Sequence, residues 1–243
     1  MDSATAARLV EINRQFYESF SQEFSATRAR IQPGVQRILG NLKLDEQILD
    51  LGSGNGELAA ALLRLGFRGR YLGLDFSPSL VEEARRRTSS GGEPRAAFIQ
   101  ADLTSSTWAE DLPHPMFQCV LLFAVLHHIP DGTNRARILR QVSGLLHPGG
   151  KLFLSVWQFL NSPRWQKRIL PWKTVGLDDC ELDPGDTLLD WRAGGNGIRY
   201  VHHFSYEELQ DLADRTGYFI AESFSADGKE GNLGLYQVWG RNP

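Results

Sequence analysis

A glycine-rich segment between a predicted strand and a predicted helix is the strongest chemical signal in the chain. It reads Asp50-Leu51-Gly52-Ser53-Gly54-Asn55-Gly56. Glycines at this spacing let the backbone turn sharply and approach a ligand without a Cβ in the way, although a purely structural turn is the alternative. Asp75 ends the next predicted strand, and an acidic residue at that edge of a sheet can hold two ribose hydroxyls. The two features together predict a nucleoside-binding site.

The glycine spacing distinguishes between classes of nucleotide ligand. Dinucleotide-binding folds use G-x-G-x-x-G, which brings a pyrophosphate to a helix N-terminus. Here the pattern is D-x-G-x-G-x-G, and Glu57 stands where the third glycine would be. Asp50 would repel a phosphate, but it would attract a cationic amine such as that of a methionine group. The pattern therefore favours a nucleoside that carries an amino acid over a dinucleotide.

A parallel sheet would bring these residues to one edge, and the rest of the chain predicts such a sheet. We expect strands at 47–51, 71–75, 97–101, 118–123 and 151–156, and helices at 4–22, from Pro33, and at 57–65, 78–87 and 134–146. This alternation indicates a doubly wound, mostly parallel α/β sheet that is covered on both faces. A helix capped by Ser205 and two closing strands at 219–224 and 235–239 would complete the fold.

The expected organisation is a single domain spanning 1–243. Its parts are N-terminal helices at 1–44, a cofactor-binding core at 45–157, a lid-like insertion on the substrate side at 158–204, and a C-terminal helix and hairpin at 205–243. The insertion is expected because prolines, glycines and tryptophans interrupt the alternation there.

Composition narrows the class of protein further. The net charge of −3 argues against a surface that coats nucleic acid throughout. No apolar stretch approaches the roughly 18 residues of a membrane span, and the N-terminus lacks the apolar block of a signal peptide. Cys119 and Cys180 make neither a disulfide framework nor a metal site. We therefore expect a cytoplasmic protein with no membrane partner and no metal.

Four ordered segments resemble the motifs of the class I S-adenosylmethionine-dependent methyltransferases. They are 50–56, Asp75, 100–103 (Gln-Ala-Asp-Leu) and 123–130. The resemblance covers roughly residues 45–157 and implies a Rossmann-like, seven-stranded sheet that ends in a reversed hairpin. It also implies that S-adenosylmethionine is the cofactor and S-adenosylhomocysteine the product.

The resemblance implies a role in cofactor binding for each motif. Asp50 and the glycine segment would flank the methionine part, and Asp75 would bind the ribose. Asp102 would accept a hydrogen bond from the adenine amino group, and Phe123 would border the sulfonium. The predicted cofactor-binding residues are Asp50, Gly52, Ser53, Gly54, Asn55, Gly56, Asp75, Phe76, Asp102, Leu103 and Phe123.

Methyl transfer from a sulfonium is an in-line displacement, and alignment and desolvation can supply most of its acceleration. A general base is needed only if the acceptor must lose a proton. His127 and His128 follow the fourth predicted strand, and histidine titrates near neutrality, so either is a candidate base. The alternative is that one of them caps a loop or packs against the cofactor. No Asn-Pro-Pro-Tyr-like segment follows this strand, which argues against methylation of an adenine or glutamine amino group.

The flanking segments resemble the eukaryotic wobble-uridine tRNA methyltransferases, which esterify a carboxymethyl group on the anticodon uridine. The similar segments are 24–28 (Phe-Ser-Ala-Thr-Arg), 185–191 and 199–204 (Arg-Tyr-Val-His-His-Phe). Asp190 departs from the family pattern, which has proline before Trp191. The resemblance implies an oxygen of tRNA, such as a carboxylate, as the acceptor and a small activating protein as a partner.

An ester-forming enzyme needs a cation to position the carboxylate rather than a base. The predicted substrate-binding residues are Arg28, Trp157, Trp191, Arg199, Tyr200 and His202, and Arg199 and His202 are also catalytic candidates. Arg199 and His202 could instead only tie the insertion to the core. Residues 151–177 contain five basic and no acidic side chains among three tryptophans, which suits an RNA loop, or else a solvated surface with buried anchors.

Three functions remain open at this level. The first is a methyltransferase that acts on a carboxylate or other oxygen of tRNA. The second is a small-molecule O- or C-methyltransferase whose acceptor lies under the insertion, and the third is a non-catalytic, methyltransferase-like binding module. The joint presence of Asp50, Asp75 and Asp102 argues against the third, because a scaffold has no physical need for all three carboxylates.

Overall fold

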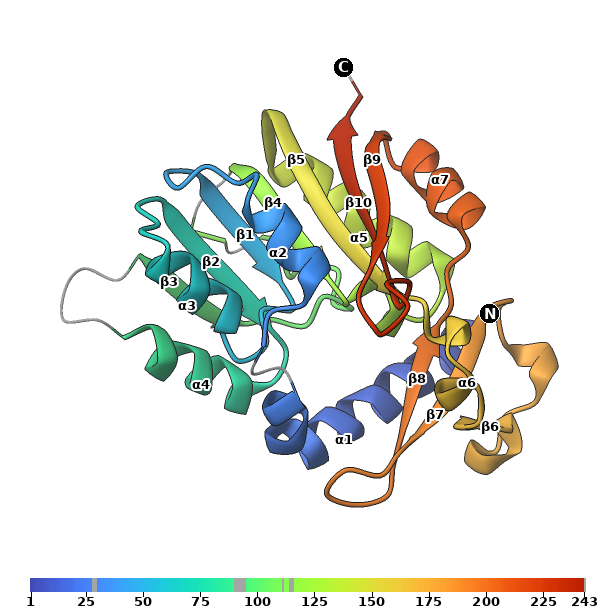
Figure 1. Ribbon diagram of the computed structural model, residues 1–243. Coiled ribbons are helices and arrows are strands. Elements are labelled where there is room, and N and C mark those ends of the chain that lie inside the picture. Colours follow the sequence, from blue (N-terminus) through green and yellow to red (C-terminus); the bar gives the residue numbers. More distant parts are fainter. Residues whose placement is uncertain (28–29, 90–94, 111, 114–115, 243) are drawn as a thin grey trace.

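Seven strands form the central sheet of the computed structural model, which describes residues 1–27, 30–89, 95–110, 112–113 and 116–242 (Figure 1). The strands are β1 (Gln47–Leu51), β2 (Arg70–Asp75), β3 (Ala96–Gln100), β4 (Phe117–Phe123), β5 (Leu146–Trp157), β9 (Tyr218–Ala226) and β10 (Gly234–Arg241). Their order is β3-β2-β1-β4-β5-β10-β9, and β10 runs antiparallel to both neighbours. The other pairs are parallel, which confirms the predicted doubly wound sheet with its reversed hairpin.

Helices cover both faces of this sheet (Figure 1). The helices are α2 (Pro33–Leu39), α3 (Glu57–Arg64), α4 (Pro78–Thr88), α5 (Gly132–Leu145) and α7 (Tyr206–Arg215). Apolar side chains of α5 and α7 pack with one set of strand residues, and those of α2, α3 and α4 pack with the other set. The alternation of side chains along each strand produces the two sets, so that Ile48 and Leu49 enter opposite cores.

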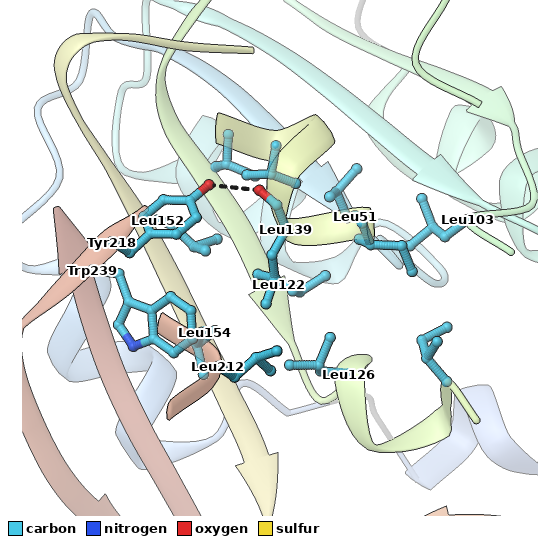
Figure 2. Close-up of a cluster of buried hydrophobic side chains, with 14 of the residues drawn as sticks. Leu51, Leu103, Leu122, Leu126, Leu139, Leu152, Leu154, Leu212, Tyr218 and Trp239 are labelled. Carbon is cyan, nitrogen blue, oxygen red and sulfur yellow. Dashed lines mark hydrogen bonds between the residues drawn. The ribbon is translucent and has the colours of Figure 1, made fainter. Parts of the chain in front are cut away.

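The core under α5 and α7 is the larger of the two and contains the biggest buried rings (Figure 2). Leu122, Leu152 and Leu154 from adjacent strands are fully buried there, together with Trp239. The hydroxyl group of Tyr218, which is also buried, donates a hydrogen bond to the Leu139 carbonyl oxygen over 3.0 Å. A buried polar group that is paired in this way does not weaken the core.

The insertion contains a second sheet that the sequence pattern did not predict. The elements are α6 (Pro163–Gln166), β6 (Ile169–Leu170), β7 (Asp186–Trp191) and β8 (Gly197–His202), and the strand order is β6-β7-β8. All pairs in it are antiparallel. β6 has only two residues, and the buried positions of β7 and β8 follow one another instead of alternating with exposed ones, so the sequence shows no period of two there. The sheet packs on the N-terminal helix through Leu9, Leu188 and Tyr200.

The N-terminal helix α1 (Ser3–Thr27) is longer than expected and is kinked at Phe20, whose φ is −124° and ψ 22°. β5 also differs from expectation, because it begins at Leu146 rather than at residue 151. The predicted cap of the C-terminal helix is confirmed, since the Ser205 Oγ accepts a hydrogen bond from the Glu208 backbone N–H over 3.1 Å. Within the described ranges, no helix has the length and apolar character that crossing a bilayer requires.

Candidate active site

Helix α1 lies across the carboxyl ends of the parallel strands (Figure 1). Residues of α1 and of the strand ends line a cavity of about 250 Å³. Ten of the predicted cofactor residues line it, namely Asp50, Gly52, Ser53, Gly54, Asn55, Asp75, Phe76, Asp102, Leu103 and Phe123. Residues Val10, Asn13, Arg14 and Tyr17 of α1 line the opposite wall. The described lining includes no residue of 158–204, so α1 rather than the insertion covers this cavity.

The glycine segment forms a left-handed turn between β1 and α3. Gly52, Gly54 and Gly56 have φ values of 78°, 54° and 73°, which disfavour any side chain. A Cβ at Gly52 would come within 2.2 Å of the Val125 side chain, whereas one at Gly54 would meet no atom within 4 Å. Gly52 therefore permits close packing of two loops, and Gly54 leaves open space for a ligand.

Gly56 differs from the other predicted cofactor residues in its surroundings. It is not among the residues that line the cavity, and it stands before the first residue of α3. A Cβ there would come within 2.7 Å of the Ala84 Cβ on α4. We attribute the requirement for glycine at this position to the close approach of α3 and α4.

Asp50 is buried on β1 and lies against β2. The Tyr71 hydroxyl donates a short hydrogen bond to the Asp50 Oδ2. Burial raises the pKa of Asp50 to about 7; the Tyr71 hydrogen bond opposes this shift, and the nearby charge of Asp75 adds to it. Near neutrality the carboxyl group is therefore poised between its neutral and ionised forms, and a cationic ligand would favour the ionised form.

Asp75 ends β2, and backbone N–H groups hold both of its oxygens. Oδ2 accepts from the Gly54 N–H over 2.9 Å, and Oδ1 accepts from the Ser77 N–H over 3.0 Å. Burial raises the pKa of Asp75, and these N–H groups partly oppose that effect. The side chain joins the glycine segment to the start of α4, and its remaining lone pairs face the cavity that it lines.

Asp102 lies past the end of β3, at the mouth of the cavity. Its Oδ1 accepts from the Thr104 backbone N–H over 2.8 Å and from the Thr104 hydroxyl over 2.6 Å. Its Oδ2 forms an ion pair with the Arg14 Nη2 of α1, also at 2.8 Å. Both partners of this ion pair are partly exposed, so it contributes little stability. It nevertheless fixes α1 over the site that is predicted for adenine.

His128 links the wall of the cavity to α1 and to the insertion. Its Nε2 lies 2.9 Å from the Tyr17 hydroxyl, and its Nδ1 lies 3.3 Å from the Tyr200 carbonyl oxygen. A carbonyl oxygen only accepts hydrogen bonds, so we assign the proton to Nδ1. Nε2 of the neutral ring then accepts from Tyr17. This tautomer places a basic nitrogen and a hydroxyl next to each other beside the cavity.

His127, the other candidate base, is directed away from the cavity. It is buried and is not among the lining residues. Its Nδ1 accepts a hydrogen bond from the Trp157 backbone N–H over 3.2 Å. The geometry therefore favours His128 over His127 as the group that faces an acceptor.

Arg199 lies within a box of aromatic rings rather than on the cavity wall. Its guanidinium carbon is 4.8 Å from the Trp157 ring centroid, 5.4 Å from Trp191 and 5.6 Å from Phe16. The residue is only 4% exposed. Cation–π contacts of this kind stabilise a buried guanidinium. They hold β8 against α1, which is the structural role that the sequence left open for Arg199.

His202 belongs to a buried polar cluster between β8 and α7. Its Nδ1 lies 2.7 Å from Asp186 Oδ1, and its Nε2 lies 2.9 Å from Glu208 Oε1. The Tyr200 hydroxyl donates to the same Asp186 oxygen over 2.6 Å. His202 and Tyr200 are fully buried and do not line the cavity, so contact with a substrate there is not what their geometry supports.

The remaining predicted substrate residues that the structure describes, Trp157 and Trp191, do not line the cavity. Trp157 is half-buried beside Trp165, and Trp191 is buried with its Nε1 donating to the Ala193 carbonyl oxygen over 2.6 Å. Arg28 lies outside the described residues.

Sequence reasoning missed Asn13, Arg14 and Tyr17, three of the polar residues that α1 places on the cavity. Asn13 donates to the His128 carbonyl oxygen over 3.1 Å and accepts from the Tyr200 N–H over 2.8 Å, so it connects the 3-10 turn Leu126–His128, which follows β4, to β8. Arg14 and Tyr17 contact Asp102 and His128, as described above. A signal was present, because Asn13, Arg14 and Tyr17 lie on one helix face with Val10, a mixture of polar and apolar residues that a purely apolar core would not explain.

The residues that line this cavity fit S-adenosylmethionine. A carboxyl group that suits an ammonium, a second that suits ribose hydroxyls and a third beside the position predicted for adenine follow one another along the strand ends, and Gly54 leaves open space at the turn. Fold and site together define a class I methyltransferase. A family model described as a methyltransferase domain matches residues 23–223, and the chain belongs to that family.

Several relatives extend the similarity beyond the core. A protein of Encephalitozoon cuniculi, named as a methyltransferase, is 29% identical over 86% of this chain and 87% of its own length. The probable tRNA methyltransferase 9B of Bos taurus is 27% identical over 71% of this chain, which spans 35% of that protein. The ubiquinone biosynthesis O-methyltransferase of Xanthomonas axonopodis pv. citri is 36% identical over 52% of this chain and 45% of its length.

Solved structures share the fold. An S-adenosylmethionine-dependent methyltransferase of Methanosarcina mazei superposes with a TM-score of 0.66 and 24% identity, over 87% of this chain and 98% of that one. A Burkholderia thailandensis N-methyltransferase with bound S-adenosylhomocysteine gives a TM-score of 0.66 at 17% identity, over 100% of this chain and 92% of that one. The methyltransferase in complex with the Trm112 activator of Haloferax volcanii superposes with a TM-score of 0.65 and 18% identity, over 95% of this chain and 97% of that one. The chain is an S-adenosylmethionine-dependent methyltransferase.

Proposed function

We propose that the cavity under α1 binds the cofactor through the three carboxylates. Asp50 would hold the ammonium group, Asp75 the ribose hydroxyls, and Asp102 with Leu103 the adenine. The single observation that carries this proposal is that all four residues line one cavity together with the open turn at Gly54. When bound, S-adenosylmethionine supplies an electrophilic methyl group on a sulfonium.

The acceptor that we propose is an oxygen atom of a tRNA nucleoside. Support comes from the similarity to the tRNA methyltransferase 9B proteins and from a basic surface on the insertion. On that surface Arg164 and Arg168 each lie 5.2 Å from the Trp165 ring, with Lys167 and Lys173 exposed nearby. Basic side chains suit phosphates, and exposed parts of tryptophan rings suit unstacked bases.

Nucleoside analysis tests the tRNA proposal directly. The protein is incubated with labelled S-adenosylmethionine and with total tRNA from cells that lack it, and the tRNA is then digested and its nucleosides separated. We expect label in a single nucleoside, and release of that label by mild base would identify a methyl ester. Absence of label from tRNA, while S-adenosylhomocysteine still binds, would contradict the tRNA proposal but not the cofactor site.

A triple variant identifies the surface that is used. Changing Arg164, Lys167 and Lys173 to Ala should lower tRNA affinity and weaken its dependence on salt, because fewer counterions are released. Lys43→Ala with Lys151→Ala, near the opposite edge of the sheet, is the matched control. Equal affinity in both variants would place RNA elsewhere on the molecule. Whether a small activating protein is needed stays a prediction, and the same assay with and without such a partner tests it.

A second candidate acceptor, a small-molecule hydroxyl, is favoured by the Tyr17–His128 pair. A hydroxyl must lose its proton as its oxygen forms a bond to the methyl carbon, whereas a carboxylate has no proton to lose. Nε2 of His128 can receive that proton through the Tyr17 hydroxyl, and the imidazolium that results keeps its Nδ1–H on the Tyr200 carbonyl oxygen. The relatives that are named as ubiquinone biosynthesis O-methyltransferases support this alternative.

A further inference from the structure

Asp50 and Tyr71 form a buried pair that the established activity does not explain. Both side chains are 3% exposed, and the Tyr71 hydroxyl donates to the Asp50 Oδ2. Register explains the meeting, because Tyr71 on β2 pairs with Ile48 on β1, two residues before Asp50, and side chains two apart share a face. Tyr71 is therefore held by the core under α2, α3 and α4, with only its hydroxyl at the cavity end.

The other oxygen of Asp50 is in a different situation. Among the described residues, Oδ1 has no hydrogen-bond partner, and no cationic side chain lies within 4.0 Å of the carboxyl group. Asp50 nevertheless lines the cavity, so its small exposed fraction is directed there. A buried carboxylate without a cation is costly, and a cation supplied by a ligand removes that cost.

The charges around Asp50 leave this position open for a cation. Tyr71 and Asp75 are its neighbours on β2, and neither is a cation. The other ionisable groups on the cavity wall are Arg14, Tyr17, Arg30, Glu57, Asp102 and His128. Arg14 is paired with Asp102, and Glu57 with Arg64 and Arg87. Asp50 and Asp75 are then the carboxyl groups of the wall that have no ion pair among the described residues, so the field beside them favours an ammonium group.

We propose that Tyr71 is a positioning residue of the cofactor site, which holds one oxygen of Asp50 so that the other receives the ammonium group of S-adenosylmethionine. The inference rests on the proposed role of Asp50 and adds a group that never touches the cofactor. It also predicts coupling to protons. Burial places the pKa of Asp50 near 7, so binding of an ammonium group drives the remaining neutral carboxyl groups to release their proton.

Calorimetry with two ligands tests the coupling on the unmodified chain. S-adenosylhomocysteine carries the amino acid part, and 5′-methylthioadenosine lacks it but keeps the ribose and adenine. Between pH 6 and pH 8 we expect S-adenosylhomocysteine affinity to rise about tenfold, with a binding enthalpy that depends on the buffer because a proton is released. The 5′-methylthioadenosine affinity reports any effect of pH on the binding of ribose and adenine and should lack this tenfold rise. Identical profiles for the two ligands would overturn the proposal.

Tyr71→Phe removes only the hydroxyl, so it isolates the positioning role. We expect about a tenfold loss of S-adenosylhomocysteine affinity at pH 7 and a profile displaced to higher pH, because a hydrogen bond that favours ionised Asp50 is gone. The 5′-methylthioadenosine affinity should not change. Tyr218→Phe, which removes another buried tyrosine hydroxyl far from the cavity, is the matched control and should leave both affinities unchanged.

Asp50→Asn separates the two levels of the proposal. If this variant binds S-adenosylhomocysteine as well as the unmodified chain, the proposed role of Asp50 is wrong. If it binds weakly but Tyr71→Phe binds normally with an unshifted profile, only the positioning role of Tyr71 is wrong. If Tyr71→Phe weakens both ligands equally, Tyr71 supports the fold rather than the carboxyl group, and the inference is also overturned.

Discussion

The two buried carboxylates of the site are held by different kinds of donor. Backbone N–H groups bind both oxygens of Asp75, whereas a side-chain hydroxyl binds one oxygen of Asp50. Asp75 is therefore fixed by the chain path itself, and its orientation survives changes in neighbouring side chains. Asp50 depends on one side chain, that of Tyr71, so a substitution at Tyr71 can change both the pKa and the orientation of the Asp50 carboxyl group.

Asp75→Ala should weaken S-adenosylhomocysteine binding by about 1.5–3 kcal/mol, the usual contribution of a charge-assisted hydrogen bond. The variant also releases the Gly54 N–H, which adds to the loss. Titration calorimetry measures the change, with the exposed Asp211→Ala as the control. Unchanged affinity would mean that the ribose is held by another group.

His128→Asn distinguishes the two acceptor classes. For a hydroxyl acceptor we expect the transfer rate to fall by about 10²–10⁴, the usual contribution of a general base. For a carboxylate acceptor the fall should be less than about tenfold, since no proton is removed. Single-turnover rates with labelled cofactor measure this, and Tyr17→Phe should follow His128→Asn in direction. A large loss on a carboxylate acceptor would contradict the assignment of His128 as a base.

At the level of elements, α1 rather than the insertion covers the cavity, and the insertion supports α1 through its strand β8. α1 covers the cavity with Asn13, Arg14 and Tyr17, and β8 holds α1 in place through Arg199 and its aromatic box. The insertion thus acts on the site indirectly. Its exposed basic side chains remain available for a large acceptor such as RNA.

The cluster between β8 and α7 should make stability depend on pH. Burial lowers the pKa of His202, but its hydrogen bonds to Asp186 and Glu208 raise it more, and the net result is above the ordinary value. The contribution of His202 to the free energy of unfolding is therefore fully present below about pH 6.5, its pKa in the unfolded chain. It is lost as the pH rises through the higher pKa of His202 in the folded protein. His202→Gln should lower the free energy of unfolding by about 3 kcal/mol at pH 6, and by less at pH 9.

Urea unfolding of the two proteins at both pH values measures this difference, and His147→Gln at an exposed position is the control. An equal loss at pH 6 and pH 9 would mean that His202 stabilises the junction in its neutral form. If the His202→Gln variant folds but no longer binds S-adenosylhomocysteine, His202 has a role in the active site rather than a purely structural one.

Local pattern predicted the central sheet well and the site in part. The glycine segment, Asp75 and Asp102 are visible because strand ends and turn residues have local signatures. The α1 residues were missed because only tertiary packing decides what a helix covers. The burial of Arg199 and His202 could not be predicted, because a sequence shows charge but not burial, and both a substrate role and a structural role were compatible with it. Their rings and carboxylate partners come from segments distant in the chain.

At the scale of the whole molecule, the site is built on strands whose apolar side chains form the two cores, one on each face of the sheet. Strand ends carry Asp50 and Asp75, and the same strands bury their apolar residues under helices on either side. Leu122 is fully buried in the larger core (Figure 2). The next residue, Phe123, lines the cavity. The position of the site thus depends on the packing beneath it.

Leu122→Ala should lower the free energy of unfolding by about 2–5 kcal/mol, from lost burial plus the cavity that it leaves. Urea denaturation measures the loss, and Leu65→Ala on the surface is the control with an expected change within about 0.5 kcal/mol. A similar small effect at Leu122 would mean that this core is loosely packed.

A crystal structure of the chain with S-adenosylhomocysteine tests the central claim most directly. The account predicts adenine beside Asp102 and Leu103, ribose hydroxyls on Asp75, and the amino group on the Asp50 oxygen that Tyr71 leaves open, all beneath α1. A ligand bound outside this cavity, or one whose amino group points away from Asp50, would contradict it.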